Sequence, residues 1–187
     1  RSICRACIMD TTNIENYLKS FGQNVVEDSK KLLHSKKGST SLGKSIRFKV
    51  EKTATGFSTK FYMDDYGTFL DKGVSGNKKK QSFKDYKGRG MSSPYSYTTK
   101  GPPIDILSKW VKRKGIKGHG MKKGRDKDTG RYISGLAIYI SHKIKTRGIK
   151  SLAFFQKPLG LWYDRLQHDF LKIFKQDIQS YLTTFTK

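Results

Sequence analysis

The chain has 187 residues, and its 39 lysine and arginine residues outnumber 15 aspartate and glutamate residues, for a formal net charge of +24. Because 35% of the residues are hydrophobic and 12% are aromatic, the chain can bury a core, which excludes a fully disordered protein. No stretch approaches the roughly 20 consecutive apolar residues that cross a bilayer, so we expect no membrane contact. The excess charge predicts a polyanion, an acidic neighbour or an assembly as the partner.

The first nine residues are predicted to be an N-terminal extension. Cys4 and Cys7 are the only cysteines, and their spacing is that of half a zinc site or of a redox pair. A zinc ribbon needs a second pair of ligands and a redox motif follows a strand, so we interpret the thiols as incidental and expect no metal or cofactor. Two cysteines without a disulfide framework indicate synthesis in a reducing cytoplasm. Met9 offers an alternative natural start.

Residues 10–33 are predicted to form a helix. Ile14, Leu18, Phe21 and Val25 recur near the 3.6-residue period that places apolar side chains on one face. A Gly-Ser-Thr run at residues 38–40 then breaks the helical pattern.

A β-hairpin is predicted after this helix. Residues 46–50 and 57–63 alternate apolar and polar side chains, which is the period of a half-buried strand. A short turn that contains Gly56 joins the two runs. Residues 66–70 then form either a short helix or a third strand, which ends at Gly73.

The composition changes between residues 74 and 101, where Lys, Gly, Ser and Tyr dominate without a clear period. A segment of this length without regular structure is uncommon inside a compact domain, so we expect an extended basic arm. Pro102 and Pro103 then prepare a helix start, and that helix ends at Gly115.

A second basic, glycine-rich loop is expected at residues 115–131. Helical spacing of apolar residues predicts two further helices, at residues 133–145 and 159–185. The elements together predict an α+β fold in which a small antiparallel sheet is packed by an N-terminal helix and C-terminal helices. We expect one domain over residues 10–187.

The positive charge is concentrated in residues 78–150, which hold 21 basic and 4 acidic side chains for a net charge of +17. Interleaved tyrosines at positions 86, 95, 97 and 132 suit stacking on nucleic-acid bases. The alternatives are a solvated loop surface or loops that dock on acidic subunits. No known recognition module is present, so sequence-specific binding is not expected. The candidate contacts to DNA or to an acidic partner are Lys78, Lys79, Lys80, Lys84, Lys87, Arg89, Lys112, Arg113, Lys114, Lys117, Lys122, Lys123, Arg125 and Arg131.

Catalytic patterns are weak in this sequence. Asp64 and Asp65 form an adjacent acidic pair that suits Mg²⁺, but no third carboxylate stands at a matched position. The glycine-rich runs lack the Gly-Lys-Ser/Thr ending of a phosphate-binding loop. We therefore expect no enzyme, with a metal-dependent nuclease centred on this pair as a weak alternative.

Short segments in a fixed order carry a family resemblance. They are Asp65–Gly67, Asp71–Gly76, Ser93–Tyr97, Gly101–Pro103, Lys109–Val111, Arg113–Ile116, Gly130–Ser134, Gly148–Ile149 and Phe154–Pro158. In this order the chain resembles the neck, or tail-completion, proteins of tailed bacteriophages, which are small α+β subunits that form a ring between the portal vertex and the tail. The resemblance covers about residues 14–174 of the chain.

The resemblance implies a structural virion protein without a cofactor or catalysis. The family usually packs a Tyr-Gly…Asp/Glu-x-Gly segment beside the sheet, and Tyr66, Gly67, Asp71 and Gly73 match it. Residues 77–92 are more lysine-rich than the resemblance leads us to expect, and the Cys4–Cys7 end has no family counterpart. The roles of tail terminator, completion protein and portal-proximal adaptor therefore stay open.

As implied by the resemblance, we expect a hexameric ring first and a twelve-fold ring second, at the neck of a virion that assembles in the host cytoplasm. Its expected partners are portal or adaptor proteins, tail-tube or sheath proteins, and packaged DNA in the channel. The alternative is a soluble, non-specific nucleic-acid-binding protein that uses the same basic loops. Aromatic anchors suit interfaces, although a tryptophan at helical spacing is more often a core residue. The candidate subunit contacts are Tyr66, Asp71, Tyr95, Tyr97 and Trp110.

Overall fold

The computed structural model describes residues 11–53, 56–116, 123–125 and 132–185. It confirms the predicted α+β class, with helices and small antiparallel sheets. The chain packs as two compact units: unit 1 is formed by residues 1–67, 84–89 and 154–187, and unit 2 by residues 68–83 and 90–153. A single domain over residues 10–187 stays a prediction, and each unit is described by itself.

Unit 1 begins with helix α1 (Thr12–Lys37). Its predicted apolar face is confirmed, because Ile14, Leu18, Phe21 and Val25 are all buried. The helix continues four residues beyond the predicted end at residue 33 and stops at Gly38, which has a φ of 72°. A short helix α2 (Ser41–Ser45) follows, and the Thr40 side chain caps it by accepting a hydrogen bond from the Gly43 N–H.

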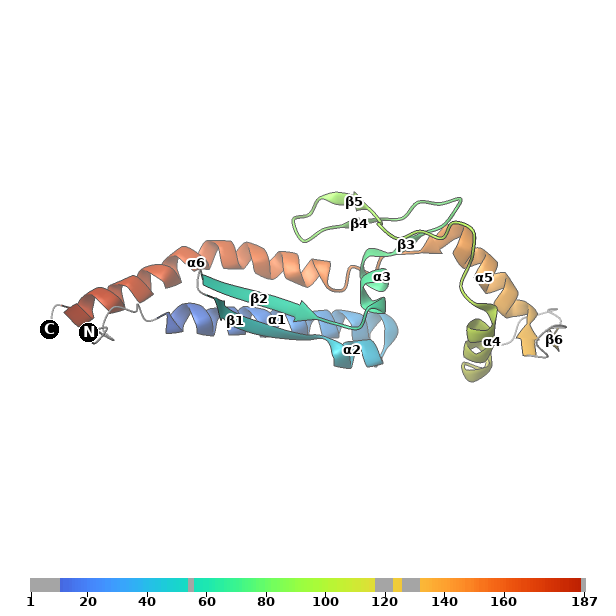
Figure 1. The fold of residues 1–187 in the computed structure, drawn as a ribbon, viewed down its shortest axis with the longest axis horizontal. Coiled ribbons are helices and arrows are strands. Elements are labelled where there is room, and N and C mark those ends of the chain that lie inside the picture. The colour runs from blue at the N-terminus through green and yellow to red at the C-terminus, as the bar shows by residue number, and fades with distance from the viewer. Residues whose placement is uncertain (1–10, 54–55, 117–122, 126–131, 186–187) are drawn as a thin grey trace, which may run out of the picture. The chain divides into compact units, whose positions relative to one another are not determined.

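The predicted hairpin consists of strands β1 (Arg47–Thr53) and β2 (Gly56–Tyr62), which pair antiparallel. The register places Phe48 opposite Phe61. The Phe61 ring packs edge-on against Phe21 of α1 at 6.2 Å between ring centroids and against Phe155 at 5.4 Å. The hairpin therefore lies along α1 and covers its apolar face (Figure 1).

Helix α6 (Gln156–Phe185) runs antiparallel to α1. Two polar contacts record this direction. The Ile14 N–H donates to Asp177 Oδ2 at 3.1 Å near the end of α6, and Trp162 Nε1 donates to Asp28 Oδ2 at 2.8 Å near its start. The buried Asp177 carboxylate thus satisfies a backbone donor in the first turn of α1, where Thr11 makes no side-chain cap.

Unit 2 is built from short elements. Helix α3 begins at the end of unit 1 and includes residues 66–70, so this segment is a helix and not a third strand. The elements are α3 (Tyr66–Lys72), β3 (Val74–Ser75), β4 (Ser82–Lys84), β5 (Gly90–Ser92), α4 (Ile104–Arg113), β6 (Lys123–Arg125), β7 (Tyr132–Ser134), α5 (Gly135–Arg147) and β8 (Gly148–Ile149).

The segment expected as an irregular arm at residues 74–101 contains the strands β3, β4 and β5. Strand β3 pairs antiparallel with β8, and Ser75 also forms a parallel bridge with Ser96. Strands of two or three residues are too short to show an alternating pattern, so the sequence pattern does not reveal them.

Helices α4 and α5 pack against each other. Ser141 Oγ of α5 donates to the Pro102 carbonyl before α4 at 2.8 Å, and the Ser134 N–H before α5 donates to Ser108 Oγ of α4 at 3.3 Å. These contacts show that the two helices are antiparallel. In the described part of the chain, no helix is long and apolar enough to cross a membrane.

Candidate polyanion interface

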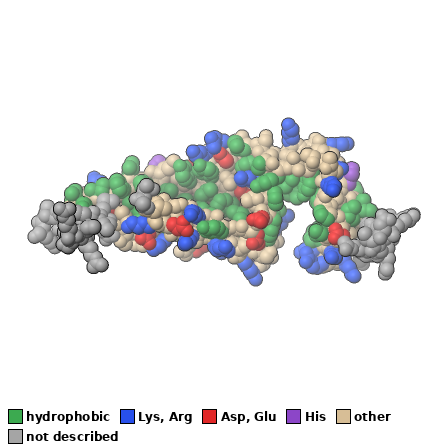
Figure 2. All heavy atoms as spheres, in the orientation of Figure 1, with side chains coloured by type: hydrophobic (Ala, Val, Ile, Leu, Met, Phe, Trp, Pro, Cys, Tyr) green, Lys and Arg blue, Asp and Glu red, His purple; other side chains and the backbone are tan. Residues whose placement is uncertain are grey.

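The basic residues that the sequence pattern groups together lie on separate parts of the structure. Lys84, Lys87 and Arg89 belong to unit 1, whereas Lys78 and Lys112 with their neighbours belong to unit 2. On the face drawn in Figure 2, Lys and Arg side chains lie among hydrophobic and other side chains. The basic residues that are close in the sequence therefore divide between the two units.

The three consecutive lysines of unit 2 lie on a turn that is anchored to the end of helix α5. The Asn77 N–H donates to the Lys145 carbonyl at 2.9 Å, and the Lys78 N–H donates to the Thr146 carbonyl at 3.0 Å. On the far side of the turn, Gln81 Nε2 donates to the Arg147 carbonyl at 2.7 Å. The last carbonyls of α5 thus hold the backbone of this turn in place.

This anchoring brings two further cations beside the three lysines. Lys145 and Arg147 lie in the last turn of α5, which is the negative end of the helix dipole and favours cations. Lys78, Lys79 and Lys80 are exposed and have no ion pair among the described residues. We name this set the α5-end cluster: Lys78, Lys79, Lys80, Lys145 and Arg147.

Lys145 and Arg147 contribute to the net charge of residues 78–150 but are not among the contacts predicted from the sequence. The available signal was their position at the end of the helix predicted at residues 133–145, with Lys145 in its last turn and Arg147 two residues beyond it, where basic residues are favoured. Their proximity to the lysine turn depends on hydrogen bonds to backbone carbonyls between segments more than 60 residues apart, such as the bond from the Gln81 side chain to the Arg147 carbonyl with a separation of 66.

A second basic group lies at the C-terminal end of α4, where Lys112, Arg113 and Lys114 are exposed. Because α4 and α5 are antiparallel, this group lies near the start of α5 and not near its end. Helix α5 has 13 residues, so its ends are about 20 Å apart. The two basic groups of unit 2 are therefore distinct surfaces.

The remaining predicted contacts in this region are only partly described. Lys123 and Arg125 lie on strand β6, which pairs antiparallel with β7. Lys117, Lys122 and Arg131 lie outside the described residues, as do Cys4, Cys7 and Met9.

The basic loop of unit 1 folds around its own acid. Arg89 Nε donates to Asp85 Oδ2 at 2.9 Å, and the backbone N–H groups of Lys87 and Arg89 both donate to Oδ1 at 2.9 Å. Burial opposes ionisation of Asp85, but the hydrogen bonds from Arg89 outweigh it and hold the pKa of the carboxyl below its ordinary value. Arg89 is thus neutralised locally.

Tyr86 of the same loop packs edge-on against Tyr163 of α6, with 5.2 Å between the ring centroids. Its backbone carbonyl also lies close to Gly160, where an added Cβ would approach it to 2.5 Å. The loop therefore acts as a structural contact to α6, and the Tyr86 ring is already engaged within the unit.

The aromatic interface candidates are also engaged within their own units. Tyr66 is 42% exposed, and its hydroxyl forms a hydrogen bond with Ser41 Oγ at 2.9 Å. The Tyr95 ring packs edge-on against Phe69 at 4.4 Å. Tyr97 is half-buried, and this burial raises the pKa of its hydroxyl above the ordinary value.

The other two interface candidates differ in burial. Asp71 is only 2% exposed, and its backbone carbonyl accepts hydrogen bonds from Ser151 Oγ and from the Ala153 N–H. Trp110 is half-buried on α4. Asp71 therefore belongs to the interior of unit 2, whereas Trp110 leaves part of its ring at the surface.

The acidic pair Asp64 and Asp65 is exposed at the start of α3. The Asp64 backbone N–H donates to Ser45 Oγ at 3.1 Å, and its carbonyl accepts from the Gly67 N–H at 2.8 Å, so the segment is a turn before the helix. Among the described residues, no group of three or more His, Cys, Asp or Glu side chains is arranged to hold a metal ion.

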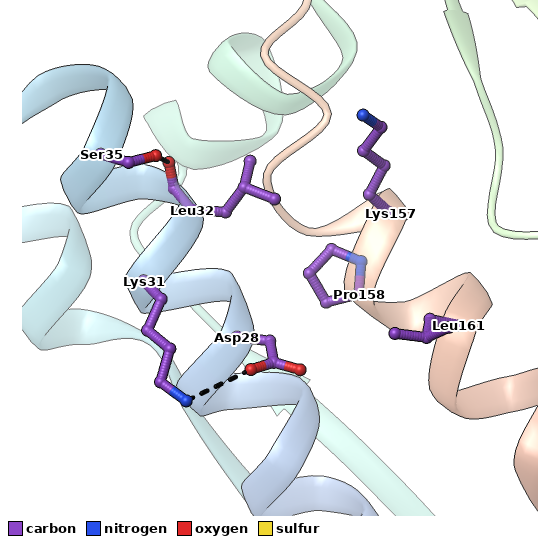
Figure 3. Close-up of a pocket in the computed structure, with 7 residues that line it drawn as sticks. All are labelled: Asp28, Lys31, Leu32, Ser35, Lys157, Pro158 and Leu161. Atoms are coloured by element: carbon purple, nitrogen blue, oxygen red, sulfur yellow. Dashed lines mark hydrogen bonds and ion pairs between the residues drawn. The ribbon is translucent and has the colours of Figure 1, made fainter.

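Unit 1 also has an open groove of about 550 Å³ between α1 and the first turns of α6 (Figure 3). Its surface combines apolar side chains with two lysines. Among the described residues, the one carboxylate that lines it is that of Asp28, which is held by Trp162 and by Lys31, whose Nζ lies 3.5 Å from Asp28 Oδ1. The groove therefore offers an apolar, cationic surface. The lining residues are Asp28, Lys31, Leu32, Ser35, Lys157, Pro158 and Leu161.

Comparison of the chain with protein-family models, with curated proteins and with solved structures found no match in any of the three.

Proposed function

We propose that the protein is a structural subunit of the head-to-tail connector of a tailed bacteriophage. Three of the segments that carry the sequence resemblance, Asp71–Gly76, Ser93–Tyr97 and Gly148–Ile149, meet around strand β3. The Ser75 N–H donates to the Tyr95 carbonyl at 2.7 Å, and the Tyr97 N–H donates to the Ser75 carbonyl at 2.8 Å. This convergence is the observation that supports the proposal, because segments distant in the sequence form one packed motif.

The backbone of this motif requires glycine at two positions. Gly73 and Gly148 have φ values of 76° and 75°, in the left-handed region that favours glycine. A Cβ at Gly148 would lie 2.0 Å from the Val74 carbonyl oxygen, and one at Gly73 would lie 2.8 Å from the Ile149 carbonyl oxygen. The motif therefore contributes a tight backbone junction, which suits a structural role.

In this proposal the protein is a passive joint that works by binding. It forms a ring of identical subunits, hexameric first or twelve-fold, between the portal or adaptor and the tail tube or sheath. The basic surfaces of unit 2 face packaged DNA or acidic patches of these neighbours.

Mass spectrometry and electron microscopy of purified particles test this proposal. We expect the chain at the neck of phage particles whose genome encodes it. We also expect that its deletion leaves filled heads and unattached tails. Absence of the chain from purified particles contradicts the proposal.

The second candidate is a soluble protein that binds nucleic acid without sequence preference, and the α5-end cluster favours it. Fluorescence anisotropy with duplex DNA at a series of salt concentrations tests the cluster. We expect the Lys78→Gln/Lys79→Gln/Lys80→Gln variant to bind more weakly at low salt. The slope of log K against log salt should fall by about 0.9 for each phosphate that the variant no longer neutralises.

A matched control replaces Lys37, Lys44 and Lys172, which are exposed lysines of unit 1, by Gln. The change in net charge is the same, so a specific cluster predicts a smaller effect. Equal effects in the two triple variants would mean that the protein attracts DNA only through its total charge.

A further inference from the structure

The C-terminal half of α6 has an exposed apolar face. Leu171 is 73% exposed, Phe170 is 40% exposed and Phe174 is 37% exposed. Phe174 lies four residues after Phe170 and three after Leu171, so its side chain neighbours both on the helix surface and the three form one stripe. The Phe170 and Phe174 rings stack with 6.2 Å between centroids and an interplanar angle of 6°, which makes the stripe flat. We name Phe170, Leu171 and Phe174 the α6 outer stripe.

Polar contacts to α1 explain why these apolar side chains face solvent. Tyr17 Oη donates to Asp169 Oδ2 at 3.0 Å, and Asp177 accepts from the backbone of α1. These two carboxylates lie eight residues apart and fix the rotation of α6. The Phe170 and Phe174 side chains are consequently turned partly away from α1.

The charges beside the stripe are complementary to those of a second α6 helix in the antiparallel orientation. Asp164 and Lys175 are both exposed and have no ion pair among the described residues. They are 11 residues apart, about three helical turns, so both lie on the face of Leu171. If two α6 helices meet antiparallel and are centred between Asp169 and Phe170, Asp164 of each copy lies opposite Lys175 of the other. A parallel pair would instead place like charges together.

We propose that the α6 outer stripe binds the same stripe of a second copy, antiparallel and related by a two-fold axis, with reciprocal Asp164–Lys175 ion pairs. Phe170 and Leu171 of the two copies form the centre of the contact, each Phe174 lies towards its edge, and the charges set its direction. This contact is isologous, so it differs from the head-to-tail contacts that close a ring. It does not depend on the assignment to a phage connector.

Sedimentation velocity over a range of concentrations tests the stripe. We expect the wild-type chain to form a dimer and Leu171→Glu to weaken it by about tenfold or more, because a charge is placed at the centre of the contact. The control is Ile106→Glu, which changes a 60% exposed side chain on α4 and should leave the dimer unchanged. Circular dichroism establishes that both variants are folded.

Charge reversal tests the direction of the contact. Asp164→Lys and Lys175→Asp should each weaken the homodimer, because each creates two like-charge contacts. Their equimolar mixture should form a heterodimer of near wild-type affinity, and the double variant should recover the homodimer. Failure of both rescues overturns the antiparallel arrangement, and a wild-type chain that stays monomeric overturns the proposal altogether. Absence of the chain from phage particles affects only the connector assignment.

Discussion

The two units of this protein are held together in different ways. In unit 1 the buried side chains are mostly large and apolar, and Val25, Leu33, Leu42 and Ile46 are at most 1% exposed. In unit 2 the buried apolar side chains among the described residues are Val74, Val111 and Ala137, whereas five polar side chains are buried there: Asp71, Ser75, Ser108, Ser134 and Ser141.

Serine hydroxyls in unit 2 act as connections to backbone groups. Ser93 Oγ donates to the Gly73 carbonyl at 2.7 Å, Ser141 Oγ donates to the Pro102 carbonyl, and Ser75 Oγ accepts from the Gln81 N–H at 3.0 Å. Neutral hydrogen bonds of this kind stabilise a fold without using lysine or arginine side chains.

The two units also differ in net charge and in how their charged side chains are paired. The segments of unit 1 hold 20 basic and 11 acidic residues, a net charge of +9, and those of unit 2 hold 19 and 4, a net charge of +15. In unit 1, Glu51 pairs with Lys49 and Lys60, and hydrogen bonds from these lysines hold the pKa of its carboxyl below its ordinary value. In unit 2, the α5-end cluster has no such partners among the described residues. A scaffold of neutral hydrogen bonds therefore leaves the cations of unit 2 available for a partner.

The largest expected effect comes from the apolar core of unit 1. Leu33 is 1% exposed, so Leu33→Ala should lower the free energy of unfolding by about 2–5 kcal/mol through reduced burial and a cavity. Urea denaturation and hydrogen exchange of unit 1 peptides measure it. Leu161→Ala, at a 52% exposed position, is the control, with a change of about 0.5 kcal/mol or less. A comparable loss of stability in the two variants would contradict the assignment of the core.

The tight backbone of unit 2 should be nearly as sensitive. Gly148→Ala combines a left-handed backbone with a Cβ that meets the Val74 carbonyl, so we expect the free energy of unfolding to fall by about 2–4 kcal/mol. Gly88→Ala is the matched control, because Gly88 has a φ of 77° but no atom within 4 Å of the added Cβ. The difference between the two variants in thermal unfolding isolates the steric part, and no difference would show that β3 and β8 are not closely packed.

A pair of serine variants compares a buried hydroxyl of unit 2 with one of unit 1. Ser141→Ala removes the hydrogen bond to Pro102 and leaves that carbonyl with one partner fewer, so it should lower the free energy of unfolding by about 1 kcal/mol. Ser29→Ala in unit 1 should be neutral or slightly stabilising. Ser29 is fully buried within α1, and its hydroxyl has no hydrogen-bond partner among the described residues. Urea denaturation compares them, and a larger destabilisation by Ser29→Ala would reverse the comparison.

The smallest effect concerns the polar contacts between α1 and α6. Burial, and then the hydrogen bond to Asp169, raise the pKa of Tyr17 from the ordinary 10.0 to about 12. Because the folded state holds this proton more tightly, the stabilising contribution is complete below pH 10 and disappears as the pH rises through about 12.

Tyr17→Phe should therefore reduce the fall in stability between pH 10 and pH 12, and ultraviolet titration should lack one of the latest-ionising tyrosines. Tyr139→Phe, at a 47% exposed position, serves as the control for the removal of a hydroxyl. An unchanged pH profile in Tyr17→Phe would show that the hydroxyl is not bonded to Asp169.

The sequence pattern predicts the long helices and the hairpin of unit 1 but not the short strands of unit 2. Ile14, Leu18 and Val25 repeat with the helical period, and the hairpin around Gly56 alternates, because both patterns arise within a few neighbouring residues. The pairing of Val74 with Ile149 leaves no such pattern, because each strand has two residues and its partner lies 75 positions away.

The α5-end cluster was predicted only in part, because contacts between distant segments leave no local sequence pattern. The lysines at positions 78–80 stand out in the sequence, but their connection to Lys145 and Arg147 depends on the backbone of Asn77 and Lys78. Conversely, Lys87 and Arg89 are near them in the sequence but belong to unit 1 and fold around Asp85.

The net charge of +24, the α+β class and the positions of the main helices and of the hairpin follow from the sequence alone, because composition and local periodicity determine them. Only the tertiary structure decided which cations gather at the end of α5 and which face of α6 is exposed. Both depend on hydrogen bonds between residues far apart in the chain, such as Ile14 with Asp177, and no local pattern records those partners.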